Sequence, residues 1–238
     1  MRFEITEKDA LVIVDAQRDF CPGGSLPVPE GDKVVPVLND YVRLFRKAGS
    51  RIYATRDWHP PNHMSFEEQG GPWPPHCIQG SEGAEFHPDL ELPEGTMVIS
   101  KAASPSKEAY SGFDGTRLAE DLKEKGIKRV FIGGLATDYC VKSTVLDALK
   151  HGFETILLLD ATLGVNVEPG ESQKTIDEMK SSGASTATLS DIPEQLAELK
   201  ERDSLEEIEE EALKRAETKK VARLRTRGPY RKALIEAW

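Results

Sequence analysis

Cysteine is scarce in this sequence of 238 residues, which contains only Cys21, Cys77 and Cys140. An odd and scattered set does not form a disulfide framework, so we expect a reducing compartment in which a thiol can do chemistry. No apolar run approaches the roughly 20 residues that cross a bilayer, and the first residues lack the pattern of a secretory signal peptide. These absences predict a cytoplasmic protein without a membrane partner.

Positive charge is also in short supply. The chain has 31 Lys and Arg against 41 Asp and Glu, for a formal net charge of −10. Such a balance repels polyanions, so nucleic acid is not an expected partner. Hydrophobic residues make up 38% and charged residues 30% of the chain, which is typical of a globular protein long enough for one sizeable core.

Short apolar runs alternate with helical stretches along most of the chain. We expect strands at 10–14, 51–55, 97–99, 129–132, 155–159 and 186–189, and helices at 33–48, 114–125, 138–150 and 171–181. Asp114 and Thr137 are the expected N-caps of the second and third helices. This alternation predicts a three-layer α/β fold, in which helices cover both faces of a parallel sheet.

The composition changes near Pro193. Residues 194–211 are acidic and residues 214–232 are mostly basic. We therefore divide the chain into a domain over 1–192 and a charged helical C-terminal extension over 193–238. The narrow apolar stripe within 204–220 is too small to be stable alone, so this helix should dock on its own domain or on a second subunit. A homo-oligomer is thus left open.

Reactive side chains directly follow the predicted strands. Asp15, Asp57 and Lys101 follow the first three strands, and Cys140 lies in the turn after the fourth. Since the carboxyl ends of parallel strands meet at one edge, these groups should lie together. Cys140 is expected in the first turn of a helix, where backbone amides and the helix dipole lower the pKa of a thiol. It is a candidate nucleophile with Asp15 as base and Lys101 as charge partner, and a buried structural cysteine is the alternative.

Four of the five histidines fall in the irregular segment 56–95. Asp57 and His59 are two residues apart, so in an extended segment their side chains point to the same side. His76 follows in a proline-rich stretch. Asp and His are ligands for zinc, iron or manganese, and three protein ligands leave positions for water and substrate. The alternative is that these are solvated loop residues.

Five stretches of the chain together resemble a known family. The chain resembles the nicotinamidase/pyrazinamidase group of the isochorismatase-like cysteine hydrolases. The stretches that carry the resemblance are IVDAQRDFCPGGSL, TRDWHPPNHMSF, WPPHCIQGSEGAEFH, VISKA and GGLATDYCVKSTVLDAL. The resemblance implies an isochorismatase-like fold over residues 1–192, with a parallel sheet of about six strands in the order 3-2-1-4-5-6. It also implies a cis peptide bond before Thr137.

The resemblance further implies a reaction. Nicotinamide, and also pyrazinamide, would be hydrolysed to the acid and ammonia through a cysteine thioester, in NAD salvage. Cys140 would be the nucleophile, Asp15 the general base and Lys101 its charge partner. Another amide hydrolase of the same fold is the alternative, followed by a non-catalytic ligand-binding member of the family.

The remaining implied roles concern metal and substrate. One divalent ion, with zinc favoured over iron or manganese, would bind Asp57, His59 and His76. His63 would be a further ligand or a close neighbour of the ion, and Ser65 would contact metal-bound water. The groups implied to bind the substrate are Phe20 and Trp73, on either side of the pyridine ring, and the backbone amides of Ala136 and Cys140, as an oxyanion hole.

Overall fold

The computed structural model describes residues 2–192 together with 195, 197 and 214. The elements below all belong to one compact unit, Met1–Pro193. The predicted helical extension over 193–238 lies outside the described residues apart from these three isolated positions, and the division into two domains stays a prediction. In the described part of the chain, no helix combines the length and the apolar character needed to span a membrane.

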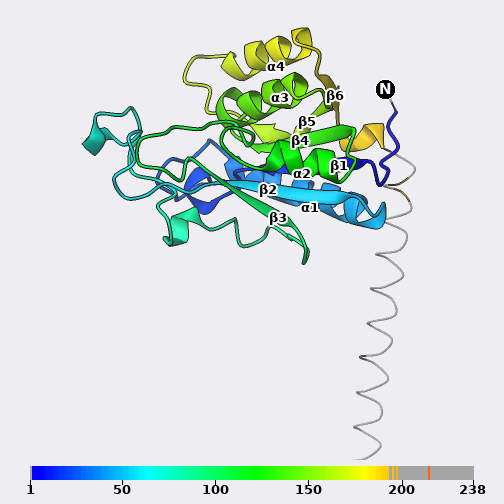
Figure 1. Ribbon diagram of the computed structural model, residues 1–238, viewed down its shortest axis with the longest axis horizontal. Coiled ribbons are helices and arrows are strands. Elements are labelled where there is room, and N and C mark those ends of the chain that lie inside the picture. The colour runs from blue at the N-terminus through cyan, green and yellow to red at the C-terminus, as the bar shows by residue number, and fades with distance from the viewer. Residues whose placement is uncertain (1, 193–194, 196, 198–213, 215–238) are drawn as a thin grey trace, which may run out of the picture. The chain divides into compact units, whose positions relative to one another are not determined.

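A parallel sheet of six strands forms the centre of the fold (Figure 1). The strands are β1 (Asp9–Val14), β2 (Arg51–Asp57), β3 (Met97–Lys101), β4 (Arg129–Leu135), β5 (Glu154–Leu163) and β6 (Ser185–Ala187). They lie in the order β3-β2-β1-β4-β5-β6, with every neighbouring pair parallel. The predicted fold class and strand order are confirmed.

In the described part of the chain, four helices cover the sheet: α1 (Val34–Lys47), α2 (Leu118–Glu124), α3 (Lys142–Lys150) and α4 (Glu171–Ser181). Val12 and Val14 of β1 pack in one core cluster with Leu122 of α2 and Val145 of α3. The intervening residues of β1 point to the opposite face, where α1 packs across β1, β2, β4 and β5. Helices on both faces bury β1 along its whole length, which explains its continuous apolar sequence.

Short turns complete the described elements. Five 3-10 turns lie at Arg18–Phe20, Gly31–Lys33, Glu67–Gln69, Glu82–Ala84 and Leu189–Asp191, and a π-helical turn lies at Thr137–Val141. The predicted strand 186–189 is wrong at its end, because the last 3-10 turn begins at Leu189 and is closed by hydrogen bonds between Thr188 and Asp191.

Both predicted N-caps are wrong. The carboxylate of Asp114 accepts from Nζ of Lys107 at 2.7 Å, and α2 begins only at Leu118, whose N–H is bonded to the hydroxyl of Thr116. The Thr137 hydroxyl bonds instead to that of Thr162 at 2.8 Å. Each side chain instead bonds to a partner outside the expected helix, Lys107 seven positions before Asp114 and Thr162 twenty-five positions after Thr137.

The carboxyl ends of the strands meet at one edge of the sheet. The long irregular segments that follow β2 and β3 lie together at this edge, at the left in Figure 1. The strand order changes direction between β1 and β4, and ligands of open parallel sheets bind beyond the strand ends at such a point. We therefore expect the ligand site to lie beside the residues that follow β1 and β4.

Candidate active site

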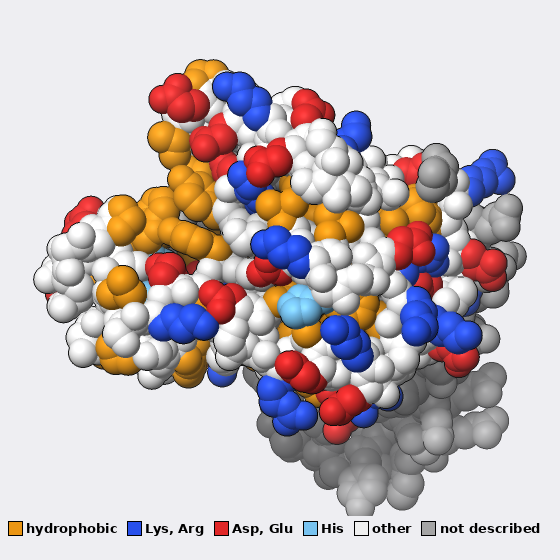
Figure 2. Space-filling view, turned by 45° about the horizontal axis from the view of Figure 1, so that its top comes forward, with side chains coloured by type: hydrophobic (Ala, Val, Ile, Leu, Met, Phe, Trp, Pro, Cys, Tyr) orange, Lys and Arg blue, Asp and Glu red, His pale blue; other side chains and the backbone are white. Residues whose placement is uncertain are grey.

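A cavity lies at this edge of the sheet. Its polar lining comes from Asp57, His59, His76, Glu108 and Cys140, and its aromatic lining from Phe20, Trp73, Tyr110 and Tyr139. Apolar side chains complete the wall, among them Leu26, Val28, Leu135 and Val165. In Figure 2, hydrophobic side chains gather on the left of the face, where the molecule is hollowed, while acidic and basic side chains are interspersed over the rest.

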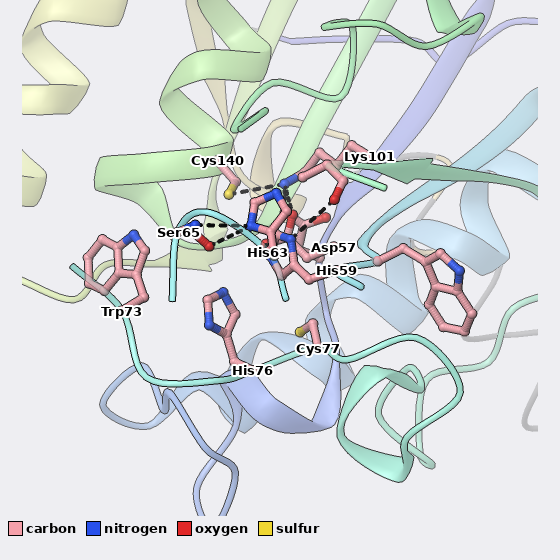
Figure 3. A network of polar contacts seen from close by, with 12 residues as sticks. Asp57, His59, His63, Ser65, Trp73, His76, Cys77, Lys101 and Cys140 are labelled. Carbon is pink, nitrogen blue, oxygen red and sulfur yellow. Dashed lines mark hydrogen bonds and ion pairs between the residues drawn. The ribbon is translucent and has the colours of Figure 1, made fainter. Parts of the chain in front are cut away.

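Lys101, the last residue of β3, is the centre of a buried charge network (Figure 3). Its Nζ lies 2.9 Å from Oδ2 of Asp15, 2.5 Å from Oδ1 of Asp57 and 3.4 Å from Sγ of Cys140. Burial opposes the ammonium charge, but the two carboxylates outweigh it and raise the pKa of Lys101 well above its usual value. The predicted strand-end residues are thus brought into direct contact.

The predicted lowering of the Cys140 pKa is wrong. Cys140 lies in the π-helical turn and not in the first turn of an α-helix. Burial raises the pKa of its thiol well above the usual value, Lys101 opposes this effect, and Asp15 and Asp57 add to it. In this environment the thiol keeps its proton until a base removes it.

Asp15 is placed to be that base. Its Oδ1 accepts a hydrogen bond from the Thr55 hydroxyl at 2.7 Å. Its Oδ2 contacts Lys101 but accepts no well-directed hydrogen bond from the described residues. Burial raises the pKa of Asp15, with Lys101 opposing. One oxygen is therefore anchored, and the other is available to accept a proton.

Asp57, His59 and His76 form a buried group suited to a metal ion. Each offers one ligand atom, and the three atoms lie within 4.8 Å of one another. Nδ1 of His59 lies 3.3 Å from the Ala102 carbonyl, and Nδ1 of His76 lies 2.7 Å from the Pro74 carbonyl. A carbonyl only accepts, so each Nδ1 carries the proton and each Nε2 presents a lone pair.

The charge states of these residues also suit a divalent cation. Burial opposes ionisation of Asp57, but the ammonium of Lys101 outweighs it and lowers the pKa of this carboxyl. Burial lowers the pKa of His76, which keeps the imidazole neutral. An ionised carboxylate and neutral imidazoles are the forms that bind zinc and related metals. The donor set fits the predicted ion.

One short segment after β1 holds much of this site in place. Gln17 donates to the Asp57 carbonyl and accepts from the Asp57 N–H, both at 2.8 Å. Oδ2 of Asp19 accepts from the N–H of Cys77 at 2.7 Å, which fixes the backbone next to His76. A Cβ on Gly83 would lie 2.2 Å from this carboxylate, so only glycine fits there.

Backbone conformations near the site are unusual. Asp15, Cys77 and Ala102 have positive φ angles of 46°, 45° and 49°, a region that residues other than glycine rarely adopt. Each lies in or next to the group of polar side chains just described. Such conformations persist where surrounding contacts enforce them, and they cluster at functional sites.

His63 and Ser65 lie beside the predicted metal group. The His63 ring is 4.2 Å from that of His59, its Nδ1 is 2.7 Å from Oγ of Ser65, and its Nε2 is 3.0 Å from the Lys107 carbonyl. Both ring nitrogens of His63 are therefore engaged within the protein. A second group that could hold an ion comprises His59, His63 and Glu108.

The predicted substrate-binding residues Phe20, Trp73, Ala136 and Cys140 all line the cavity. The cis peptide bond lies one position earlier than predicted, between Leu135 and Ala136.

Sequence reasoning missed three polar residues of the wall: Glu108, Tyr110 and Tyr139. Nε1 of Trp73 donates to the Tyr110 hydroxyl at 3.1 Å, and the Trp73 ring meets the Tyr139 ring edge to face at 5.3 Å. Tyr139 directly precedes the predicted nucleophile Cys140 in the sequence, so its position at the cavity could have been predicted. Glu108 and Tyr110 lie in a segment without periodicity that the fold carries to the cavity.

Comparison with known proteins identifies the family. Residues 9–191 match the isochorismatase domain. The chain belongs to this family.

Among its relatives, the nicotinamidase of Escherichia coli is 40% identical over 206 residues, which is 78% of this chain and 97% of that protein. The nicotinamidase/pyrazinamidase of Mycobacterium tuberculosis is 40% identical over 167 residues, 67% of this chain and 88% of that protein. The crystal structure of the pyrazinamidase of Pyrococcus horikoshii in complex with zinc is 56% identical, with a TM-score of 0.74. It covers 76% of this chain, and this chain covers 99% of it.

Proposed function

We propose that this protein is a metal-dependent nicotinamidase that hydrolyses nicotinamide, and also pyrazinamide, to the carboxylic acid and ammonia. The observation that carries the proposal is the contact between two groups at one aromatic-walled cavity. The Asp57, His59 and His76 cluster, which lines the cavity together with Cys140, touches the Asp15, Lys101 and Cys140 network through the Lys101–Asp57 ion pair. The relatives called nicotinamidase and pyrazinamidase support it.

Cys140 acts as the nucleophile in this proposal. Its sulfur attacks the carboxamide carbon while Asp15 takes the thiol proton and then delivers it to the departing nitrogen as ammonia. Oδ2 of Asp15 accepts no well-directed hydrogen bond from the described residues, and this, with the high pKa of the thiol, supports a proton transfer concerted with attack. Water then attacks the thioester, a proton passes through Asp15 back to the thiol, and the acid is released.

Lys101 compensates charge during these steps. Its ammonium contacts Asp15, Asp57 and Cys140, so it stabilises the negative charge that develops on the sulfur as the thiol loses its proton. The backbone amides of Ala136 and Cys140 are proposed to receive the carbonyl oxygen as it becomes an oxyanion. Support comes from the position of both residues on the cavity wall.

Asp57, His59 and His76 would hold the divalent ion, with zinc favoured over iron or manganese. When bound, the ion supplies a Lewis-acidic partner for the pyridine nitrogen. His63 is proposed as a neighbour of this group, because its ring nitrogens bond to Ser65 and to the Lys107 carbonyl. Ser65 is proposed to orient His63 and to contact water at the ion.

Phe20 and Trp73 are proposed to hold the flat ring of the substrate. Both are large aromatic side chains of the cavity wall, and Trp73 is fixed by its hydrogen bond to Tyr110. Ring contacts of this kind favour planar heteroaromatic substrates over aliphatic amides. The same chemistry suits nicotinamide recycling in NAD salvage. A cytoplasmic location is supported by three unpaired cysteines.

The deciding experiment measures ammonia release from nicotinamide by the purified chain, before and after treatment with a chelator and then after addition of Zn²⁺. We expect turnover that the chelator abolishes and the metal restores. An aliphatic amide of similar size is the matched control substrate. Turnover of the aliphatic amide alone would instead favour another amidase of this fold, and no turnover of any amide would favour a ligand-binding protein.

A further inference from the structure

Glu108 is an unexplained charge in the cavity. Among the described residues of the lining, it is the only acidic side chain apart from Asp57, and none of them is Lys or Arg. It is half-buried, and its Oε1 accepts from the N–H of Ala109 at 2.9 Å. No described Lys, Arg or His forms an ion pair with it, whereas Asp57 is paired with Lys101. A half-buried carboxylate without a cation is costly unless it serves the site.

The backbone around Glu108 is fixed by the site itself. The Lys107 carbonyl lies 3.0 Å from Nε2 of His63, and the Ala109 carbonyl accepts from Nζ of Lys101 at 3.2 Å. Glu108 is thus held between two anchored neighbours. A carboxylate oxygen of Glu108 lies within 4.8 Å of ring nitrogens of His59 and His63. Its charge is therefore held next to the metal group and the cavity.

The charges of the site give this residue a role. The carboxylates of Asp15, Asp57 and Glu108 together balance the ammonium of Lys101 and the divalent ion of the proposed function. A neutral amide enters a cavity whose charges are balanced, whereas the carboxylate product adds an unpaired negative charge. Without Glu108 the same cavity would carry one net positive charge and would attract the product.

We propose that Glu108 is a specificity-determining residue that weakens binding of the anionic carboxylate product relative to the neutral amide substrate, and so limits product inhibition. This inference rests on the proposed nicotinamidase function.

The test compares the wild type with Glu108→Gln, which removes the charge and nearly preserves the shape. The measured quantity is the ratio of the inhibition constant of nicotinate to the KM of nicotinamide. We expect this ratio to fall about tenfold in Glu108→Gln, because the product carboxylate no longer meets the repulsion of one negative charge, an effect of moderate strength. Glu108→Asp should restore most of the wild-type ratio. Glu124→Gln, an exposed change on α2, is the charge-matched control and should leave the ratio unchanged.

Calorimetric binding and metal content supply readouts that do not depend on turnover. Binding of nicotinate should tighten in Glu108→Gln, whereas binding of 3-acetylpyridine, a neutral ring of similar shape, should not. An unchanged ratio, or equal tightening of both ligands, would overturn the inference. Loss of bound metal in Glu108→Gln would also overturn it, since Glu108 would then be a ligand. If the wild type turns over no nicotinamide, the proposed function fails first, and the two failures are thereby distinguished.

Discussion

Nζ of Lys101 lies 3.4 Å from Sγ of Cys140, although one residue ends β3 and the other lies in the π-helical turn after β4. This contact bridges two strands separated by β2 and β1 in the sheet. It brings the only buried ammonium of the cavity region to the thiol, among the residues that the structure describes. Positive charge here stabilises a thiolate only as the proton leaves, because burial otherwise favours the thiol.

Replacing the thiol tests this relationship most directly. Cys140→Ala should abolish ammonia release from nicotinamide, because the described cavity lining then offers no thiol to form the acyl intermediate, while ligand binding is largely retained. Rates and calorimetric binding of nicotinamide measure the two effects. Cys21→Ala is the matched control, since that buried thiol has a pKa raised to about 11 and does not line the cavity. Near wild-type turnover by Cys140→Ala would disprove the nucleophile assignment.

Removing the ammonium should damage both catalysis and stability. Lys101→Ala leaves the carboxylates of Asp15 and Asp57 buried without their cation, and breaking such a pair costs about 3–5 kcal/mol. We expect kcat to fall by a factor of about 100 or more. The rate losses of Lys101→Ala and Asp15→Asn should not add, since the residues act as one unit.

Urea unfolding and steady-state kinetics of the two single variants and the double variant measure these effects. Lys150→Ala, which removes an exposed lysine of α3, is the control and should change neither stability nor rate. Additive rate losses in the double variant would show that the two residues act separately.

The metal group is tested by elemental analysis. His59→Ala and His76→Ala should each lower bound metal well below one ion per chain and raise KM for nicotinamide. His63→Ala should have an intermediate effect, because both nitrogens of His63 are occupied by Ser65 and the Lys107 carbonyl. His151→Ala, a histidine outside the cavity, should keep its metal. Full occupancy in both His59→Ala and His76→Ala would show that the ion binds elsewhere.

Gln17 should matter for metal binding without touching the ion. It brackets the backbone of Asp57 with two hydrogen bonds of 2.8 Å, so Gln17→Ala frees the residue that supplies the carboxylate. Loss of such an outer contact weakens metal affinity by about 10–100-fold. Competition with a chelator of known affinity measures the change. Gln173→Ala, on the exposed face of α4, is the control. If Gln17→Ala destabilises the fold but keeps the wild-type metal affinity, Gln17 serves only packing.

Whether a feature of this site can be predicted from the sequence depends on how far apart along the chain the residues that form it lie. The positions of Asp15, Asp57 and Lys101 follow from continuous apolar runs, since a parallel sheet brings strand ends together. Asp57 and His59 lie on the same side of the chain because side chains alternate from side to side along an extended segment, and this pattern involves only neighbouring residues. Gln17 and Asp57, by contrast, are forty positions apart and pair through loops whose course no periodicity encodes.

The errors arise from competing partners. Asp114 and Thr137 have the chemistry of N-caps, but the side chains of Lys107 and Thr162 bond to them in the folded chain, the second from twenty-five positions away. The thiol pKa was predicted from helix position alone, whereas the buried charges around Cys140 decide it. Glu108 was missed because nothing in its neighbours marks the segment 102–112 as a cavity wall.

Alkaline stability gives a test that is independent of catalysis. The hydroxyl of buried Tyr53 donates to Asp121 at 2.6 Å, and that of buried Tyr41 donates to Asp160 at 2.9 Å. Burial, followed by the nearby carboxylate, raises the pKa of both tyrosines above the unfolded value of about 10. Folding therefore holds protons that the unfolded chain releases above that pH. Their contribution to stability is complete below about pH 10 and is lost as pH rises further.

Tyr53→Phe should separate this proton linkage from packing. At pH 7 we expect a loss of about 1–3 kcal/mol, because the buried Asp121 loses its donor. Above pH 10 the free energy of unfolding should fall less steeply than in the wild type, by up to about 1.4 kcal/mol per pH unit. Urea unfolding at pH 7, 9 and 11 measures both terms. Val145→Ala removes core packing without a titrating group, so its stability should run parallel to the wild type at all three values. Parallel curves for Tyr53→Phe as well would mean that the Tyr53 hydroxyl ionises equally easily in the folded and unfolded chain, against the burial that the structure gives it.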